Sequence, residues 1–167
     1  FQPAEEGPPE GEEGGADMMI KAGVLADVDA IFGLHVFPSA LGSIAYRSGG
    51  TMASSDSFRI KVKGRQTHGA VPWGGVDPIV VAAQIVLGLQ TIPSRQLDST
   101  LTPSIITVGK IQGGVRSNII PDEVEMLGTI RTFDNHVRQD IQVRMARTAS
   151  LIAESAGATA AMEITSA

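Results

Sequence analysis

The sequence contains no cysteine. A disulfide framework and a cysteine-ligated metal site are therefore excluded within these 167 residues, and the composition agrees with a cytoplasmic location. No apolar run approaches the roughly 20 residues that a membrane-spanning helix needs. Long basic runs are also missing and the formal net charge is -5, which argues against nucleic acid or an anionic membrane as a partner.

Aromatic residues are scarce, at 4% of the chain, whereas hydrophobic residues make up 43%. Aliphatic side chains must therefore fill the core, and the length suits one ordinary domain, or a small domain with part of another. The chain has no initiator methionine and begins on an apolar segment. We therefore expect it to be an internal part of a longer protein.

The sequence pattern changes at about residue 54, which divides the chain into residues 1–53 and 54–167. In the second part, residues 58–63 alternate apolar and charged side chains, as in a sheet with one solvent-facing side. Further elements are predicted as a helix from Asp77 to about Ile92, strands at 104–110 and 124–133, a helix from Asp134 or Asn135 to Gly157, and a strand at 159–165. The order β-α-β-β-α-β predicts a ferredoxin-like four-stranded antiparallel sheet with both helices on one face.

Residues 1–53 look incomplete as a folding unit. A loop of proline, glycine and glutamate precedes a short helix that begins near Ala16 and ends near Gly23. Short strands are predicted at 29–36 and 42–47. Two short strands and one helix cannot bury themselves alone, so this part needs neighbours from elsewhere.

Two adjacent carboxylates, Glu5 and Glu6, lie between a proline and a glycine-rich run. One of them can hold a cation while the other moves a proton, provided that the strand ends there, because neighbouring strand residues point to opposite faces. The alternative is a solvated acidic loop that continues into Glu10, Glu12 and Glu13, and charge runs more often face solvent.

Two histidines are candidates for chemistry. His35 lies in an apolar strand-like segment, where a metal ligand is one interpretation and a buried, hydrogen-bonded histidine is the more common one. His68 lies in a loop of small residues that leaves a strand, and it could donate a hydrogen bond to a developing oxyanion. An exposed loop histidine is the alternative for His68.

Asn118 and Arg131 complete the set of candidates. Asn118 precedes an apolar pair and a proline, and Arg131 lies in a strand. An arginine fork suits a carboxylate, although the pattern by itself favours an arginine on the solvent-facing side of the sheet.

Together these segments resemble the M20 family of metallopeptidases and amidohydrolases, in particular its branch of N-acyl amino acid hydrolases (hippurate hydrolase-like enzymes). Each motif alone is modest, but six of them in family order are specific and span nearly the whole chain. The matching motifs are FQPAEEG (1–7), FGLHV (32–36), KGRQTHGAVP (63–72), DPI (77–79), SNIIP (117–121) and GTIRTF (128–133).

The resemblance implies a fold, a cofactor and an activity. Residues 1–53 would be a slice of a zinc-peptidase-like catalytic domain, and residues 54–167 a ferredoxin-like lid that also forms a homodimer. The full-length protein would use two divalent metal ions, Zn, Mn, Co or Ni, and metal-activated water to hydrolyse the amide bond of an N-acyl or peptidyl amino acid. The chain on its own, by contrast, is expected to be inactive, and a chain with no metal bound is consistent with the two ligands that it keeps.

The resemblance also implies residue roles. Glu5 matches the general base, and Glu6 and His35 match metal ligands. His68 matches the lid histidine that reaches the partner subunit's active site and polarises the scissile carbonyl. Asn118 and Arg131 match substrate-binding residues, Arg131 for the free α-carboxylate.

The chain departs from the family pattern in three places. The upstream His-x-Asp or Cys-x-His metal motif and the C-terminal ligand histidine are absent, and the loop after Glu6 is a few residues longer. An aminopeptidase or dipeptidase of the same family, and a non-catalytic dimerisation module, therefore remain as alternatives.

Overall fold

The computed structural model describes residues 2–4, 9 and 11–166, and the chain divides into two compact units, residues 1–45 and 46–167. The segment before the first strand belongs to the second unit through Phe133. The guanidinium carbon of Arg47 lies 5.5 Å from the centroid of the Phe133 ring, and Gly50 lies against the same side chain. The boundary between residues 53 and 54 remains a prediction about the domains of the whole protein.

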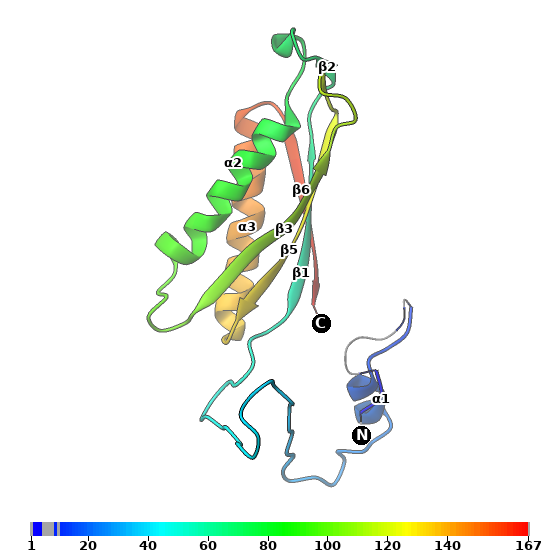
Figure 1. The fold of residues 1–167 in the computed structure, drawn as a ribbon, viewed down its shortest axis with the longest axis vertical. Helices are drawn as coiled ribbons and strands as arrows, with labels where there is room; N and C mark the ends of the chain where they lie inside the picture. Colours follow the sequence, from blue (N-terminus) through cyan, green and yellow to red (C-terminus); the bar gives the residue numbers. More distant parts are fainter. Residues whose placement is uncertain (1, 5–8, 10, 167) are drawn as a thin grey trace. The chain divides into compact units, whose positions relative to one another are not determined.

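The second unit is an antiparallel sheet of four strands in the order β3-β5-β1-β6, with both helices on one face (Figure 1). The strands are β1 (Asp56–Lys63), β3 (Ser104–Gly113), β5 (Glu123–Thr132) and β6 (Thr159–Ser166), and the helices are α2 (Pro78–Thr91) and α3 (Asn135–Ser155). This is the strand order of a βαββαβ unit with two split crossovers. The predicted ferredoxin-like fold is confirmed.

The core lies between the sheet and the two helices. In β1 the apolar side chains of Phe58, Ile60 and Val62 are buried, and the residues between them face away from the helices. Because strand side chains alternate between faces, one face of β1 supplies core and the other stays charged. The helices contribute the buried residues Val81, Ala82, Ile85, Leu89, Ile141, Met145, Ala149 and Ala153.

Both long helices begin at an aspartate, as predicted. Asp77 accepts hydrogen bonds from the backbone N–H groups of Ile79 and Val80, at 2.9 and 3.4 Å, and Asp134 caps α3 in the same way. The predicted end of the first helix at about Ile92 lies within one residue of the observed end at Thr91. After Thr91 the chain continues into one π-helical turn, η2 (Ile92–Gln96), which contains Pro93.

A buried ion pair ties α3 to the sheet. Asp56 is fully buried in β1, and its two carboxylate oxygens accept hydrogen bonds from Nε and Nη2 of Arg138, at 2.7 and 2.5 Å. These bonds raise the pKa of the Arg138 guanidinium above its usual value. The pair therefore stays charged and fixes the start of α3 against β1.

The first unit contains a single short helix among its described residues, α1 (Gly15–Lys21). It ends where expected, because Gly23 adopts a φ of 82° and its N–H donates to the carbonyl of Ile20 at 2.9 Å. The strands predicted at 29–36 and 42–47 are not formed. A strand needs a hydrogen-bonded neighbour, and no described segment pairs with these two, so Phe32 remains 96% exposed.

In the described part of the chain, no helix combines the length and the apolar character that crossing a membrane requires.

Candidate active site

Glu5 and Glu6, the predicted base and metal ligand, lie outside the described residues. The residue before them, Ala4, has a φ of 48°, in the left-handed region that residues with a Cβ rarely adopt. Such strained backbone often occurs at functional sites.

His35 is exposed in the first unit, and one of its ring nitrogens is engaged. Nδ1 lies 3.0 Å from the backbone carbonyl oxygen of Val36, and the ring stacks on Phe37 with centroids 4.7 Å apart. Because a carbonyl oxygen can only accept, in the neutral ring Nδ1 carries the proton and Nε2 keeps its lone pair. This is the arrangement in which a histidine binds a metal through Nε2 while a backbone carbonyl orients the ring.

His68 is exposed at the end of a two-residue strand, β2 (Thr67–His68). The backbone N–H of Ala70 donates to its Nδ1 over 3.1 Å, so in the neutral ring the proton is on Nε2. Nε2–H is then a hydrogen-bond donor that points to no acceptor in the described part of the chain. This is the tautomer that can stabilise negative charge on a carbonyl oxygen.

Asn118 lies next to the His68 loop. The backbone N–H of Gly69 donates to the carbonyl of Asn118 at 2.8 Å, and β2 pairs antiparallel with β4 (Ile119–Ile120). This two-stranded sheet was not predicted, since two-residue strands carry no periodic pattern. It brings His68 and Asn118 together at one end of the second unit (Figure 1).

Arg131 lies elsewhere. It is exposed near the end of β5, where its Nη1 lies 3.5 Å from the carbonyl of Ser54. The start of β5 at Glu123 follows β4 directly, and the eight residues from there to Arg131 span about 26 Å of strand. Arg131 and the His68–Asn118 pair therefore lie at opposite ends of the second unit and cannot contact one small substrate within one protomer.

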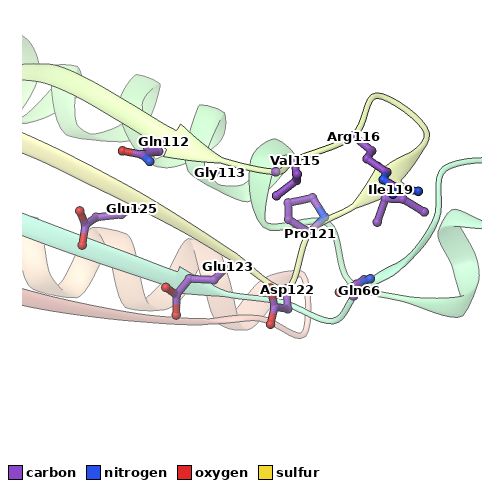
Figure 2. A pocket seen from close by; sticks show the side chains of 11 residues that line it. Gln66, Gln112, Gly113, Val115, Arg116, Ile119, Pro121, Asp122, Glu123 and Glu125 are labelled. Carbon is purple, nitrogen blue, oxygen red and sulfur yellow. The ribbon is translucent and has the colours of Figure 1, made fainter.

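A cavity of about 660 Å³ adjoins β4 (Figure 2). Its lining includes Gln66, which lies in the motif of His68, and Arg116, two residues before Asn118, which no sequence motif singled out. The available signal was the Gly113-Gly114 pair, since Gly114 has a φ of 78° and turns the chain from β3 toward β4. Carboxylates from β5, Glu123 and Glu125, line the other side and pair with Lys61 and Arg59.

A family model described as a peptidase dimerisation domain matches residues 53–155. The chain belongs to the M20 peptidase family. Its curated M20 relatives include an N-acetylcysteine deacetylase of Bacillus subtilis, 42% identical over 161 residues that cover 96% of this chain and 41% of that protein. Thermostable carboxypeptidase 2 of Saccharolobus solfataricus is 43% identical over 162 residues, which cover 95% of this chain and 40% of that protein.

A solved structure shows the same M20 fold. The YXEP protein of Bacillus subtilis, described as a dinuclear metal binding peptidase of the M20 family, is 37% identical, with a TM-score of 0.75. The match covers 99% of this chain and 39% of that one. The chain thus spans about two fifths of the length of the M20 relatives that it matches.

Among the described residues, no group of three or more His, Cys, Asp or Glu side chains could hold a metal ion. His35 fits a metal by the chemistry of its free Nε2. The other predicted ligand in this chain, Glu6, is outside the described part.

Proposed function

We propose that the full-length protein is a metal-dependent amidohydrolase that cleaves the amide bond of N-acyl or peptidyl amino acids. The observation that carries this proposal is the geometry of His68, whose exposed Nε2–H is fixed as a donor by the Ala70 N–H bond, in a chain of the M20 family. The deacetylase and carboxypeptidase activities named for its relatives also involve cleavage of an amide bond.

Glu6 and His35 would contribute ligands to two divalent cations. When bound, such cations lower the pKa of water and polarise the amide carbonyl. Carboxylate and imidazole ligands suit Zn, Mn, Co and Ni, so the identity of the metal stays open. His35 is prepared for this role because its Nδ1–H is held by the carbonyl of Val36.

The residues of this chain would handle the proton and the oxyanion. Glu5 accepts a proton from the attacking water, whose oxygen bonds to the amide carbon, and later delivers that proton to the leaving nitrogen as the C–N bond breaks. His68 donates from Nε2 to the carbonyl oxygen while it bears negative charge. One water is consumed, and a carboxylate and a free amino group are formed.

Asn118 and Arg131 would bind the substrate, and the guanidinium of Arg131 would bind the substrate's α-carboxylate. Since the two ends of the sheet are about 26 Å apart, one protomer's His68 and Asn118 would serve a different active site from its Arg131. We therefore propose that each active site draws His68 and Asn118 from a partner subunit.

The surface for this homodimer would be the β3 side of the second unit. Helix α2 exposes Ile79, Val80 and Leu87, and the edge strand β3 exposes Ile105 and Ile111. The exposure of these apolar side chains supports an interface there. The opposite edge strand, β6, exposes no large apolar side chain among its described residues. An unpaired apolar edge strand readily pairs with a second copy, in this case across a two-fold axis.

A non-catalytic dimerisation module is the second candidate for the chain taken alone. The second unit has its own buried core, whereas most of the first unit is exposed. Metal analysis of the 167-residue chain distinguishes the two, because tightly bound metal at stoichiometric amounts with amidase activity would exclude the module. We also propose a cytoplasmic location, which the cysteine-free composition supports.

A Glu5→Gln substitution in the full-length protein tests the catalytic assignment. Turnover should fall to nearly nothing while the metal content stays unchanged, because the amide keeps the shape and loses the basic oxygen. Turnover near the wild-type level would show that Glu5 is not the base. A panel of hippurate, N-acetyl amino acids and dipeptides would separate the amidohydrolase from the aminopeptidase or dipeptidase.

A further inference from the structure

Trp73 is the one tryptophan of the sequence, and 81% of it is exposed. It lies in a 3₁₀ turn, η1 (Pro72–Gly74), which Figure 1 shows at the end of the second unit where β2 lies. Tryptophan has the largest side chain, and it is enriched among the residues that contribute most to binding interfaces. An exposed indole is therefore a better indicator of a binding surface than most exposed side chains. The end of the unit that carries His68 therefore also carries a large, exposed aromatic side chain.

The loop that presents Trp73 is closely tied to His68. The backbone N–H of Val71 donates to the carbonyl of His68 at 2.8 Å, and the N–H of Gly74 donates to the carbonyl of Val71 at 3.0 Å. The hydroxyl of Thr67, on the strand itself, also donates to the Val71 carbonyl at 3.1 Å. Trp73 therefore lies in a turn that several hydrogen bonds hold to β2.

Two glycines make this turn compact. A Cβ on Gly75 would lie 2.4 Å from the carbonyl oxygen of Arg65, and one on Gly74 would lie 3.2 Å from the Thr67 hydroxyl. The loop therefore closes back on the strand that leads to His68. The backbone that carries the exposed indole is thereby held in place.

The same bonds limit the separation of Trp73 and His68. A β-turn from His68 to Val71 keeps their Cα atoms within about 7 Å. Consecutive Cα atoms are about 3.8 Å apart, so two further residues add at most about 8 Å, and the two Cα atoms are at most about 15 Å apart. An acyl group on a carbonyl that contacts His68 Nε2 is within reach of the indole.

We infer that Trp73 is a specificity residue whose indole packs against the apolar acyl group of the substrate bound at His68. The inference rests on the proposed amidohydrolase function and adds the substrate class, which is N-acyl amino acids with an aromatic or long alkyl acyl group rather than a short one. Val71 and Val115, exposed in the two loops at the same end, extend the apolar surface. Aromatic pairs gain from offset or edge contacts beyond area burial alone, so a benzoyl group should profit most.

The test compares N-benzoyl and N-acetyl derivatives of one amino acid with the full-length enzyme. In Trp73→Ala, the ratio of kcat/KM for benzoyl over acetyl should fall about tenfold, through KM, and Trp73→Phe should retain most of it. Leu151→Ala, which removes an exposed apolar side chain from α3, should leave the ratio unchanged.

Two outcomes would overturn the inference. One is a ratio that stays at the wild-type value in Trp73→Ala. The other is an equal loss on both substrates together with a shift to monomer in sedimentation, which would assign Trp73 to the contact between subunits. A wild-type enzyme that hydrolyses neither substrate would instead overturn the proposed function, so the two failures are distinguishable.

Discussion

The backbone N–H of Gly69 donates to the backbone carbonyl of Asn118 across 2.8 Å, which joins the loop after His68 to the residue that leads into β4. Two segments about 50 residues apart in sequence thereby present a histidine and an amide at the same end of the sheet. A Cβ on Gly69 would lie 3.2 Å from that carbonyl oxygen, so the approach is close. The pairing would allow the two residues to act on one substrate in the proposed function.

Replacing His68 with alanine should remove the donor to the carbonyl oxygen. We expect kcat of the full-length enzyme to fall about 100- to 1,000-fold, the usual cost of losing one oxyanion donor, with little change in melting temperature because the side chain is exposed. His136→Ala is the matched control, since His136 is also exposed and lies on α3. Equal losses in the two variants would contradict the role of His68.

Arg131→Ala should affect substrates according to their charge. If its guanidinium binds the α-carboxylate, KM for carboxylated substrates should rise about 10- to 100-fold, and KM for the corresponding amides should change far less. Steady-state kinetics on matched acid and amide pairs measures this. Arg147→Ala, another exposed arginine, is the control, and equal effects of Arg131→Ala on acids and amides would remove the carboxylate assignment.

Leu87→Glu tests the proposed interface. Leu87 is 71% exposed on α2, and a carboxylate there would be buried without a partner if two copies meet at this surface. Analytical ultracentrifugation should show the dimer weakened toward monomer, while Val143→Glu on α3 should leave it intact. A dimer of wild-type affinity in the Leu87 variant would direct the search to another surface.

Asp56→Asn should destabilise the second unit. The substitution removes the charge that Arg138 pairs with in the core, which should lower the free energy of unfolding by about 3 kcal/mol. That is the low end for buried pairs, because a quarter of the Arg138 side chain remains exposed. Urea unfolding measures it, with Asp140→Asn, which breaks an exposed i,i+4 pair with Arg144, expected to cost less than about 0.5 kcal/mol. Similar losses of unfolding free energy in the two variants would mean that the buried Asp56–Arg138 pair stabilises the fold no more than the exposed pair does.

Local signals in the sequence sufficed for most of the second unit. Alternation in β1 gave its buried face, and the aspartates at 77 and 134 marked both helix starts, because capping depends on residues close in sequence. The exposed side of α2 was less predictable. Ile79 and Val80 are apolar and yet exposed. The sequence alone does not distinguish an apolar residue of the core from one on a surface that binds a partner.

Features that depend on distant neighbours could not be predicted reliably. Residues 29–36 read as a strand, but strand formation depends on a pairing segment, and the described chain supplies none. The β2–β4 pair exists only because the tertiary fold brings two short segments together. The separation of Arg131 from His68 likewise follows from strand register and order, which the motifs alone do not contain.

The central claim is that His68 of one subunit acts in the active site of its partner. Mixing and reannealing two inactive full-length variants, Glu5→Gln and His68→Ala, tests it most directly. In a mixed dimer, the His68→Ala subunit keeps its own Glu5 and receives His68 from the Glu5→Gln subunit, so one site works. Random pairing then restores about a quarter of wild-type activity. A mixture that forms mixed dimers and remains inactive would contradict the account.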